Sequence, residues 1–239
     1  SVHYEQSLLD ATVLSATTIT ATDSTGFSST TNIGSLAEVG VLSSPDQNHH
    51  LVEGSANGET LSATVDSSRL YGYGGDDTLI GSQGSDLLRS GDGKDSLHGG
   101  DGNDLLIGGK GDDTLSGGSG SDVFRWEFGD QGSVQIPAID HIKDFNATAS
   151  VGNGGDVLDL RDLLQGEYHD GNSIGNLEQY LRFESTASGT AIHIKPHGDA
   201  AAASQTIVLD NVDLTVNGQF TNDSMIIKNL LEQGKLLVD

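Results

Sequence analysis

The sequence predicts a mainly β protein, in which a parallel β-roll leads into a small β-rich C-terminal region with two or three short helices. Three observations predict this fold. Residues 72–125 repeat a nine-residue pattern six times without a phase slip. This block holds 16 of the chain's 33 glycines, which suits tight turns whose backbone takes positive φ. After residue 125 the repeat stops, and short segments with alternating apolar residues follow.

Each repeat combines a turn with a short strand, because an aspartate recurs every nine residues and an apolar side chain follows it two positions later. The aspartates are Asp77, Asp86, Asp95, Asp104, Asp113 and Asp122, and the apolar residues are Leu79, Leu88, Leu97, Leu106, Leu115 and Phe124. Side chains alternate along a strand, so one apolar residue per repeat predicts a thin core. Two repeats make one coil. Every second aspartate should therefore stack, with Asp77, Asp95 and Asp113 on one edge and Asp86, Asp104 and Asp122 on the other.

The stacked aspartates predict a bound cation. Residues 72–125 carry ten aspartates against four Lys or Arg, a net charge of −6. Like charges at this spacing repel unless a cation neutralises them. Calcium takes about six to eight oxygen ligands in irregular geometry, and each turn offers a carboxylate and backbone carbonyls. Three aspartates per edge leave two gaps per edge, which predicts about four or more calcium ions. The alternative is a flexible Gly/Asp-rich segment, which six copies in unbroken phase disfavour.

The overall composition excludes several classes of protein. The net charge of −24 argues against binding to nucleic acid or to anionic membranes. No apolar run is long enough to span a membrane. There is no cysteine, so bound ions rather than disulfides must stabilise the fold. We expect a secreted or cell-surface monomer, and the start at Ser1 suggests a fragment or a processed product.

Residues 1–53 are predicted to form Ser/Thr-rich strands or a linker, because 17 of the first fifty residues are Ser or Thr. The roll is predicted over residues 54–125. Its first two coils are degenerate, since Leu61 and Leu70 continue the apolar series while Glu59 and Ser68 occupy the aspartate positions. Terminal repeats are expected to be atypical in this way.

Residues 126–239, called the cap below, are predicted to close the end of the roll. Alternation predicts strands at Leu181/Phe183, Ile192/Ile194 and Ile207/Leu209. Helices are predicted at residues 159–165, at residues 176–182 and at residues 222–233, the last ended by Gly234. Four acidic residues of the cap could hold one further calcium ion, or could cap strands and helices instead: Asp140, Asp144, Asp156 and Asp159.

The nonapeptides resemble the calcium-binding repeats of RTX proteins, which leave bacteria through type I secretion channels. The tail segments DHIKDF, GGDVLDLRDLLQGE, LEQYLRFE, TAIHI, QTIVLDNVDL and LLEQGKLLVD look like the C-terminal secretion region of large RTX adhesins. The resemblance covers residues 72–239 and does not extend to the sequence before them. It implies a calcium-dependent roll, a secretion signal in the last fifty or so residues, and a place at the distal end of a cell-surface adhesin.

The resemblance also implies a ligand set. Calcium is held in that family by the six repeat aspartates and by carbonyls of the turns. Carried over, the carbonyls are those of Gly72, Gly74, Gly81, Gly84, Gly99, Gly100, Gly102, Gly108, Gly109, Gly111, Gly117 and Gly118. Tyr73, Ser82 and Ser90 depart from the pattern at glycine positions, and each is tolerable only if its φ stays negative.

We therefore expect a calcium-binding module that folds outside the cell, supports secretion and stabilises the end of an adhesin, with the type I secretion machinery as its partner. The sequence lacks HExxH and GxSxG, so we expect no catalysis within this chain. Two alternatives stay open: the secretion module of an enzyme whose catalytic domain lies upstream, or an adhesin tip that binds a surface ligand. Ice binding is disfavoured because the outward residues vary: Thr78, Leu87, Ser96, Leu105, Thr114 and Val123.

Overall fold

The computed structural model describes residues 50–198, 202–216 and 218–238, together with three strands nearer the N-terminus. Those three strands are β1 (Thr12–Ser15), β2 (Thr18–Thr22) and β3 (Ser28–Asn32), and they form an antiparallel sheet in that order. The rest of the sequence before residue 50 lies outside the described residues. No helix within the described ranges combines the length and the apolar character that a membrane crossing requires.

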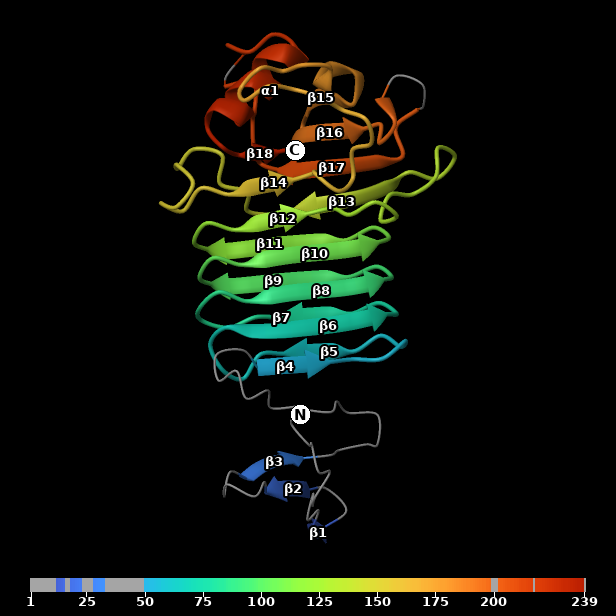
Figure 1. Cartoon of the computed structure of the whole chain (residues 1–239), viewed down its shortest axis with the longest axis vertical. Helices are drawn as coiled ribbons and strands as arrows, with labels where there is room; N and C mark the ends of the chain where they lie inside the picture. Colours follow the sequence, from blue (N-terminus) through green and yellow to red (C-terminus); the bar gives the residue numbers. More distant parts are fainter. Residues whose placement is uncertain are drawn as a thin grey trace, which may run out of the picture.

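From residue 50 to residue 125 the chain winds into a roll whose strands stack along the long axis of the molecule (Figure 1). Successive strands alternate between two parallel sheets. The β8 sheet contains β4 (His50–Glu53), β6 (Ser68–Gly74), β8 (Leu87–Asp92), β10 (Leu105–Lys110) and β12 (Val123–Arg125). The β9 sheet contains β5 (Thr60–Ser62), β7 (Thr78–Ile80), β9 (Ser96–Asp101) and β11 (Thr114–Ser119).

The register of both sheets confirms that two repeats make one coil. Leu88 pairs with Leu106 in the β8 sheet, and Leu97 pairs with Leu115 in the β9 sheet. The apolar residue of each repeat points inward and is almost completely buried, as the sequence predicted. The buried series begins in the degenerate coils and runs through Leu61, Leu70, Leu79, Leu88, Leu97, Leu106, Leu115 and Phe124.

The outward residues separate by sheet, which corrects the expectation that they form an irregular surface. Thr78, Ser96 and Thr114 are register partners in the β9 sheet. Their counterparts in the β8 sheet are Leu87, Leu105 and Val123. The apparent irregularity arises because consecutive repeats contribute to different sheets, so each sheet carries a column of similar side chains.

The cap continues both sheets of the roll (Figure 1). In the β9 sheet, β13 (Ala138–Ile142) follows β11, and β17 (Gln205–Asp210), β16 (Gly189–Ile194) and β15 (Leu181–Thr186) complete the order. In the β8 sheet, β14 (Val157–Asp159) and β18 (Leu236–Leu237) follow β12. The register is preserved across the boundary, since Leu115 pairs with Ile142 and Phe124 pairs with Leu158.

The expectation of two or three cap helices is wrong. One α-helix, α1 (Asp223–Glu232), lies where the third was predicted; Asn222 caps it by accepting the Met225 N–H, and Gly234 follows with φ of +67°. At residues 159–165 the chain makes a single turn, because Asp159 still belongs to β14 and the Leu160 N–H donates to the Leu237 carbonyl. The remaining predicted segment yields only the 3-10 turn η1 (Leu177–Gln179), since Leu181 is already extended and paired with Ile194.

The residue before the repeat aspartate contributes a second set of contacts between coils in several repeats. Asp76 Oδ1 accepts the Lys94 N–H at 2.9 Å, and Asn103 Oδ1 accepts the Ser121 N–H at 2.8 Å. Asp112 Oδ1 likewise accepts the Ile139 N–H at 2.9 Å. Lys94 occupies the same position but its ammonium group has no acceptor to offer.

Replacing Lys94 by asparagine should therefore stabilise the calcium-loaded protein. An amide oxygen there can accept the N–H of Asp112 in the next coil, a contact worth about 0.5–1.5 kcal/mol. The check is thermal unfolding in excess calcium, with Lys94→Ala as the control that removes the charge without adding an acceptor. Equal melting temperatures for the two variants would contradict the expectation.

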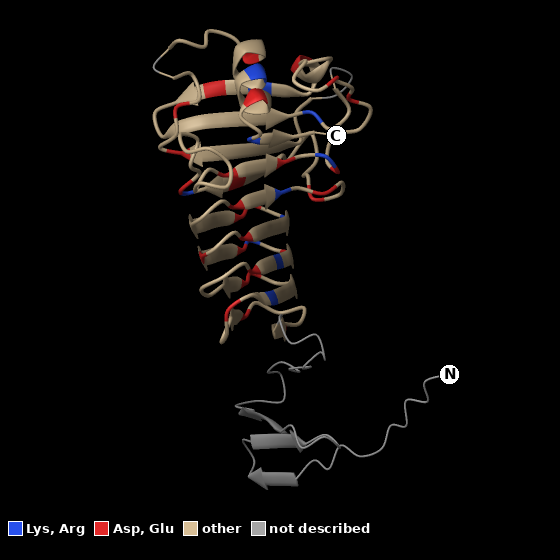
Figure 2. Cartoon of the chain, turned by 60° about the vertical axis from the view of Figure 1, so that its left-hand side comes forward, with Lys and Arg blue, Asp and Glu red and all other residues tan. Residues whose placement is uncertain are grey.

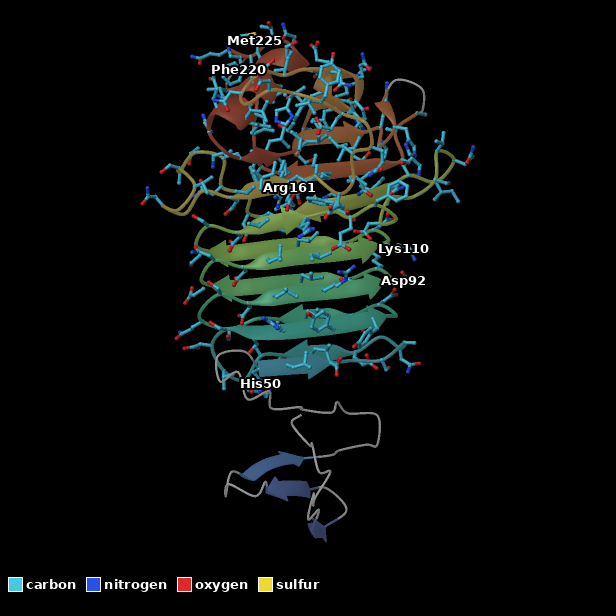
Figure 3. All side chains as sticks on the ribbon, viewed as in Figure 1. His50, Asp92, Lys110, Arg161, Phe220 and Met225 are labelled. Atoms are coloured by element: carbon cyan, nitrogen blue, oxygen red, sulfur yellow. The ribbon has the colours of Figure 1, made fainter. Side chains whose placement is uncertain are left out.

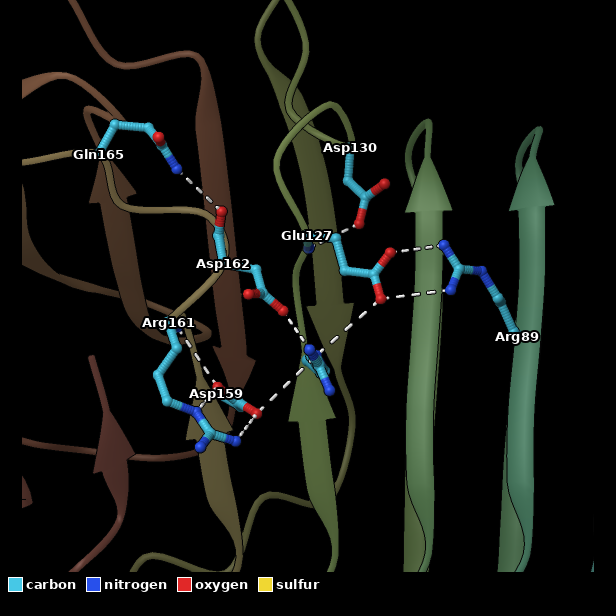
Figure 4. A network of polar contacts seen from close by, with 8 residues as sticks. Arg89, Glu127, Asp130, Asp159, Arg161, Asp162 and Gln165 are labelled. Atoms are coloured by element: carbon cyan, nitrogen blue, oxygen red, sulfur yellow. Dashed lines mark hydrogen bonds and ion pairs between the residues drawn. The ribbon is translucent and has the colours of Figure 1, made fainter. Parts of the chain in front are cut away.

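An ion-pair network ties the roll to the cap on the outer face of the β8 sheet (Figure 4). Arg89 on β8 donates to both oxygens of Glu127, at 3.2 and 2.5 Å. Arg125 on β12 pairs with Asp162, and its Nε lies 3.9 Å from Asp159 Oδ2. Arg161 donates to the same Asp159 oxygen at 2.8 Å. The network thus links strands that belong to the repeats with the first turn after β14.

Replacing Glu127 by glutamine should lower the stability of the calcium-loaded protein by about 0.5–1 kcal/mol at low ionic strength. The loss should shrink in about 0.5 M salt, since partly exposed ion pairs are screened. Chemical denaturation at the two ionic strengths measures both effects. Asp101→Asn removes one negative charge from an exposed position and serves as the control; a salt-independent loss in Glu127→Gln would contradict the account.

Candidate metal centres

The six repeat aspartates lie in two vertical rows, one along each edge of the roll, and all six are buried, with at most 3% of each residue exposed. Acidic residues follow the turns of the roll, while Lys and Arg are few (Figure 2). Exposed charges on the same turns can pair across coils, as Lys110 and Asp92 do at 2.9 Å (Figure 3). The buried rows have no such basic partner in this part of the chain, so the site is a pair of buried carboxylate rows.

One oxygen of each aspartate joins adjacent coils. The Asp77 N–H donates to Asp95 Oδ1 at 2.8 Å, and the Asp95 N–H donates to Asp113 Oδ1 at 2.9 Å. On the other edge, Asp86 and Asp104 donate in the same way to the aspartate of the next coil, Asp104 and Asp122, at 2.8 and 2.9 Å. We call this arrangement the aspartate ladder. It explains why the repeat requires aspartate, whose short side chain reaches the backbone of the preceding coil.

The second oxygen of most ladder aspartates has no partner. Among the described side chains, five buried carboxylate oxygens lack a hydrogen bond: Oδ2 of Asp77, Asp95, Asp104, Asp113 and Asp122. A buried, unpaired carboxylate oxygen is costly, so these atoms require a ligand that the polypeptide does not supply. Asp86 is the exception, because its Oδ2 accepts the Ser82 N–H at 2.6 Å and the Ser82 hydroxyl at 3.1 Å.

Glycines keep space beside these oxygens, which lie close to carbonyls of the next coil. A methyl group on Gly72 would clash with Asp77 Oδ2 and with the Ser90 carbonyl. A methyl group on Gly99 would clash with Asp104 Oδ2 and with the Gly117 carbonyl. Oxygens of two coils therefore lie near the same glycine, and no N–H or O–H group of the described residues donates to the carboxylate oxygen there. A hard cation with oxygen ligands suits this donor set, and calcium accepts carboxylates together with backbone carbonyls.

Several aspartates of the two rows have a pKa well above the usual value when no metal is bound. Burial raises the pKa of Asp77 and of Asp122 to about 6 and that of Asp104 to about 7. Burial, followed by the nearby charge of Asp140, raises the pKa of Asp113 to about 8. A bound cation would have the opposite effect and keep these groups ionised.

The four cap aspartates considered for an extra calcium site do not gather into one cluster, and protein donors engage each of them separately. Asp140 accepts from Trp126 and Gln205, and Asp156 accepts from Asn146. Asp144 accepts from the Gly117 and Gly118 amides, and Asp159 from Arg161. Nowhere in the described ranges do three Asp, Glu or His side chains gather as a metal cluster. Any ion must therefore be bound by the one repeat carboxylate that a turn provides, together with backbone oxygens.

The glycines predicted as ligands fall into two groups. Gly72, Gly81, Gly99, Gly108 and Gly117 lie against an aspartate Oδ2. The others contact the backbone of the coil before or after them: Gly74, Gly84, Gly100, Gly102, Gly109, Gly111 and Gly118. The Ser90 carbonyl was not predicted as a ligand, because serine stands there in place of glycine. Its position five residues before Asp95 was the available signal.

The three departures from the glycine pattern behave differently. Ser82 and Ser90 avoid positive φ, but Tyr73 has φ of +73°, contrary to the condition set for it. Tyr73 pairs with Gly91, which has φ of +110°, so the turn imposes this conformation. The Tyr73 ring stacks on Tyr71 with 6.4 Å between the ring centroids, and the Tyr73 hydroxyl donates to Glu53. These contacts help to offset the backbone strain of the positive φ.

The degenerate coils keep the ladder but not the unpaired oxygens. The Glu59 N–H donates to Asp77 Oδ1 at 2.8 Å, and the Glu59 carboxylate accepts the Ser55 N–H at 2.9 Å. Ser68 donates its N–H to Asp86 Oδ1 and has no carboxylate of its own. The demand for a cation is therefore concentrated in residues 72–125.

Comparison with known proteins identifies the repeats. Residues 53–88 and 89–124 each match the family model of the RTX calcium-binding nonapeptide repeat. A search of curated proteins gave no match. Among solved structures, the chain is similar to the AlgE6R3 subunit of the mannuronan C5-epimerase from Azotobacter vinelandii, with 26% identity over 73% of this chain and 78% of that chain and a TM-score of 0.44. Residues 53–124 are thus a calcium-binding module of RTX nonapeptide repeats, folded as a parallel β-roll.

Proposed function

We propose that this chain is the calcium-binding C-terminal module of a bacterial RTX adhesin that leaves the cell by type I secretion. Calcium-induced folding outside the cell would support secretion and stabilise the distal end of the adhesin. The observation that carries the calcium-dependent part is the set of five buried carboxylate oxygens without partners, stacked on two edges. The adhesin and secretion parts rest on the resemblance of the tail segments.

In this proposal the ions lie between successive coils along each edge. The carboxylate ligands are Asp77, Asp95, Asp104, Asp113 and Asp122 through Oδ2, with Asp86 as a weaker member because Ser82 already occupies its oxygen. The Ser90 carbonyl lies near Asp77 Oδ2, and the Gly117 carbonyl lies near Asp104 Oδ2. The Gly99 carbonyl has the same place beside Asp86 Oδ2. About four or more ions satisfy the two rows, in line with the gaps between stacked aspartates.

Calcium would act as a switch between the two sides of the cell envelope. A metal site that exists only in the folded state adds its binding free energy to folding. Extracellular calcium modules commonly have Kd values of about 10⁻⁴–10⁻³ M, well above the free calcium of a cytoplasm. The roll would therefore stay unfolded inside the cell, pass through a narrow channel and fold on the outside.

The proposal assigns no catalysis to this chain. An enzyme with its catalytic domain upstream could carry the same module, and a ligand-binding adhesin tip is a further alternative. The Thr78, Ser96 and Thr114 column on the β9 sheet would be the regular surface available to a ligand. The sequence of the parent gene distinguishes an adhesin from an enzyme.

Two experiments test the proposal. Calorimetric titration of the metal-free chain with calcium should show several binding events coupled to a large gain of β signal in circular dichroism; an unchanged spectrum and unchanged melting in chelator would refute it. For secretion, the chain fused behind a reporter should appear in the medium of cells that carry a type I channel. Deleting the last fifty residues should retain the reporter inside, and equal export of the truncated fusion would refute the secretion role.

A further inference from the structure

Buried carboxylates differ sharply between the roll and the cap. All five buried carboxylate oxygens without a partner belong to residues 77–122. The cap buries Asp130, Asp140, Asp156 and Asp159 as well, yet none of their buried oxygens is unpaired in the part of the chain that the structure describes. The boundary between the two behaviours falls at the end of the last repeat.

On one edge the aspartate ladder ends at Asp140. Its Oδ1 accepts the Asp113 N–H at 2.8 Å, as any ladder aspartate would. Its Oδ2 accepts the indole N–H of Trp126 at 2.6 Å and the Gln205 amide at 2.8 Å. Two protein N–H groups thus occupy the oxygen that is left without a partner in Asp77, Asp95 and Asp113.

On the other edge the ladder ends at Asp156. Its Oδ1 accepts the Asp122 N–H at 3.0 Å, and its Oδ2 accepts the Asn146 N–H at 2.7 Å. Lys235, only 1% exposed, donates from its ammonium group to the Asn146 carbonyl at 2.9 Å. Burial raises the pKa of Asp156, whereas the charge of Lys235 favours its ionised form, and burial lowers the pKa of the Lys235 amine. Asn146 thus links the ammonium group of Lys235 to the last carboxylate of this row, since it accepts from Lys235 and donates to Asp156.

The cap also has a larger apolar core than the roll. Each strand of the roll contributes one apolar residue to the hydrophobic core, whereas the cap contributes residues from its strands, its turns and α1. They are Trp126, Ile142, Phe145, Leu158, Leu160, Leu163, Leu164, Leu177, Tyr180, Leu181, Ile192, Ile194, Ile207, Leu209, Leu214, Ile226, Ile227, Leu230, Leu231, Leu236 and Val238. Burial of apolar area is the main favourable term in folding, so the cap has a source of stability that does not depend on metal.

We propose that the cap folds without calcium, because protein donors take the place of the cation at the last carboxylate of each row. They are Trp126 and Gln205 at Asp140, and Asn146, itself bound by Lys235, at Asp156. The inference rests on the proposed placement of calcium in the roll. At equilibrium the metal-free chain would then consist of an ordered cap and an unfolded roll. Export through the narrow channel of the proposed function would require passage before the cap has folded, or unfolding of the cap during passage. Asp140 Oδ1 and Asp156 Oδ1 would already be in place to accept the N–H groups of Asp113 and Asp122 when calcium arrives.

Hydrogen exchange of the full chain, followed by mass spectrometry in EDTA and in excess calcium, tests this proposal. In EDTA, peptides covering β13, β14, α1 and β15–β18 should exchange at least a hundredfold more slowly than an unfolded chain, while peptides covering β6–β11 should be unprotected. Calcium should then protect both groups. Cap peptides that exchange freely in EDTA and gain protection together with the roll would overturn the inference and leave the proposed function intact. Roll peptides that calcium does not protect would instead overturn the proposed function.

A pair of lysine variants tests the role assigned to the protein cation. Lys235→Met keeps an apolar stem but leaves Asp156 without a nearby positive charge, and it should speed exchange of the cap in EDTA at least tenfold. Lys228→Met removes an exposed lysine from α1 and is the matched control, with no change expected. Equal exchange of the two variants would overturn the assignment to Lys235. Trp126, the only tryptophan, gives an independent reading: its emission in EDTA should be that of a buried indole, and emission of a solvated indole would overturn the inference.

Discussion

Replacing Asp104 by alanine should raise the calcium concentration needed to order the roll at least tenfold. The side chain holds the Asp86 N–H through Oδ1, and its Oδ2 is among the unpaired oxygens assigned to calcium. The loss leaves a buried N–H without a partner, which costs about 1–3 kcal/mol, and also removes a ligand. The measurement is a calcium titration followed by circular dichroism, together with melting in saturating calcium.

Two other aspartates provide matched controls for this variant. Asp101→Ala removes the same charge from an exposed position in the same turn and should leave the titration nearly unchanged. Asp86→Ala should have a smaller effect than Asp104→Ala, because Ser82 already satisfies Asp86 Oδ2. In EDTA, Asp104→Ala should instead raise the stability of the folded roll, because the variant lacks a buried carboxylate whose charge no ion compensates. Identical midpoints for Asp104→Ala and Asp101→Ala would contradict the assignment.

Acid should partly replace calcium in ordering the roll. The metal-free folded state raises the pKa of Asp104 to about 7 and that of Asp113 to about 8, mainly by burial. The folded state therefore binds more protons than the unfolded chain, in which aspartate has a pKa of about 4. Stability of the metal-free roll should rise as the pH falls from about 8 towards 4. In EDTA, circular dichroism should show more β structure at pH 5.5 than at pH 8.

Calcium should show the opposite pH dependence, because protons and the ion compete for the same oxygens. Where the metal-free roll is folded, the apparent Kd at an Asp104-type site should rise about tenfold per pH unit below pH 7 for each such carboxylate, because the raised pKa belongs to that folded state. Titrations at pH 8 and pH 6 measure this change, and the Asp104→Asn variant should reduce its slope. An apparent Kd that does not depend on pH, or a metal-free roll that loses structure on acidification, would rule out the raised pKa values as the cause.

The register of the roll could be predicted from the sequence because the repeat leaves little freedom. An aspartate every nine residues and Leu79, Leu88 or Leu97 two places after it fix which residues face inward and which coils stack. One apolar side chain per strand cannot be accommodated by a shifted pairing without exposing the core. The degenerate coils with Leu61 and Leu70 follow the same logic.

The cap was harder to predict because its contacts are set by residues distant in sequence. Leu160, Leu163 and Leu164 have helical spacing, but pairing of β14 with β18 leaves room for only one turn. The ladder role of Asp140 and Asp156 was missed because loops break the regular spacing of the coils. Each of them is nevertheless followed two places later by a buried apolar residue, Ile142 or Leu158, which is the repeat signature without its glycines.

The size of the coil also determines how far the polypeptide shortens when it folds. One coil adds a single strand to each sheet, so it lengthens the roll by about 4.8 Å. The two repeats that form it span about 60 Å when fully extended. Each coil that forms outside a channel should thus draw in more than ten times its own height of extended polypeptide, and the pull would act in the direction of export.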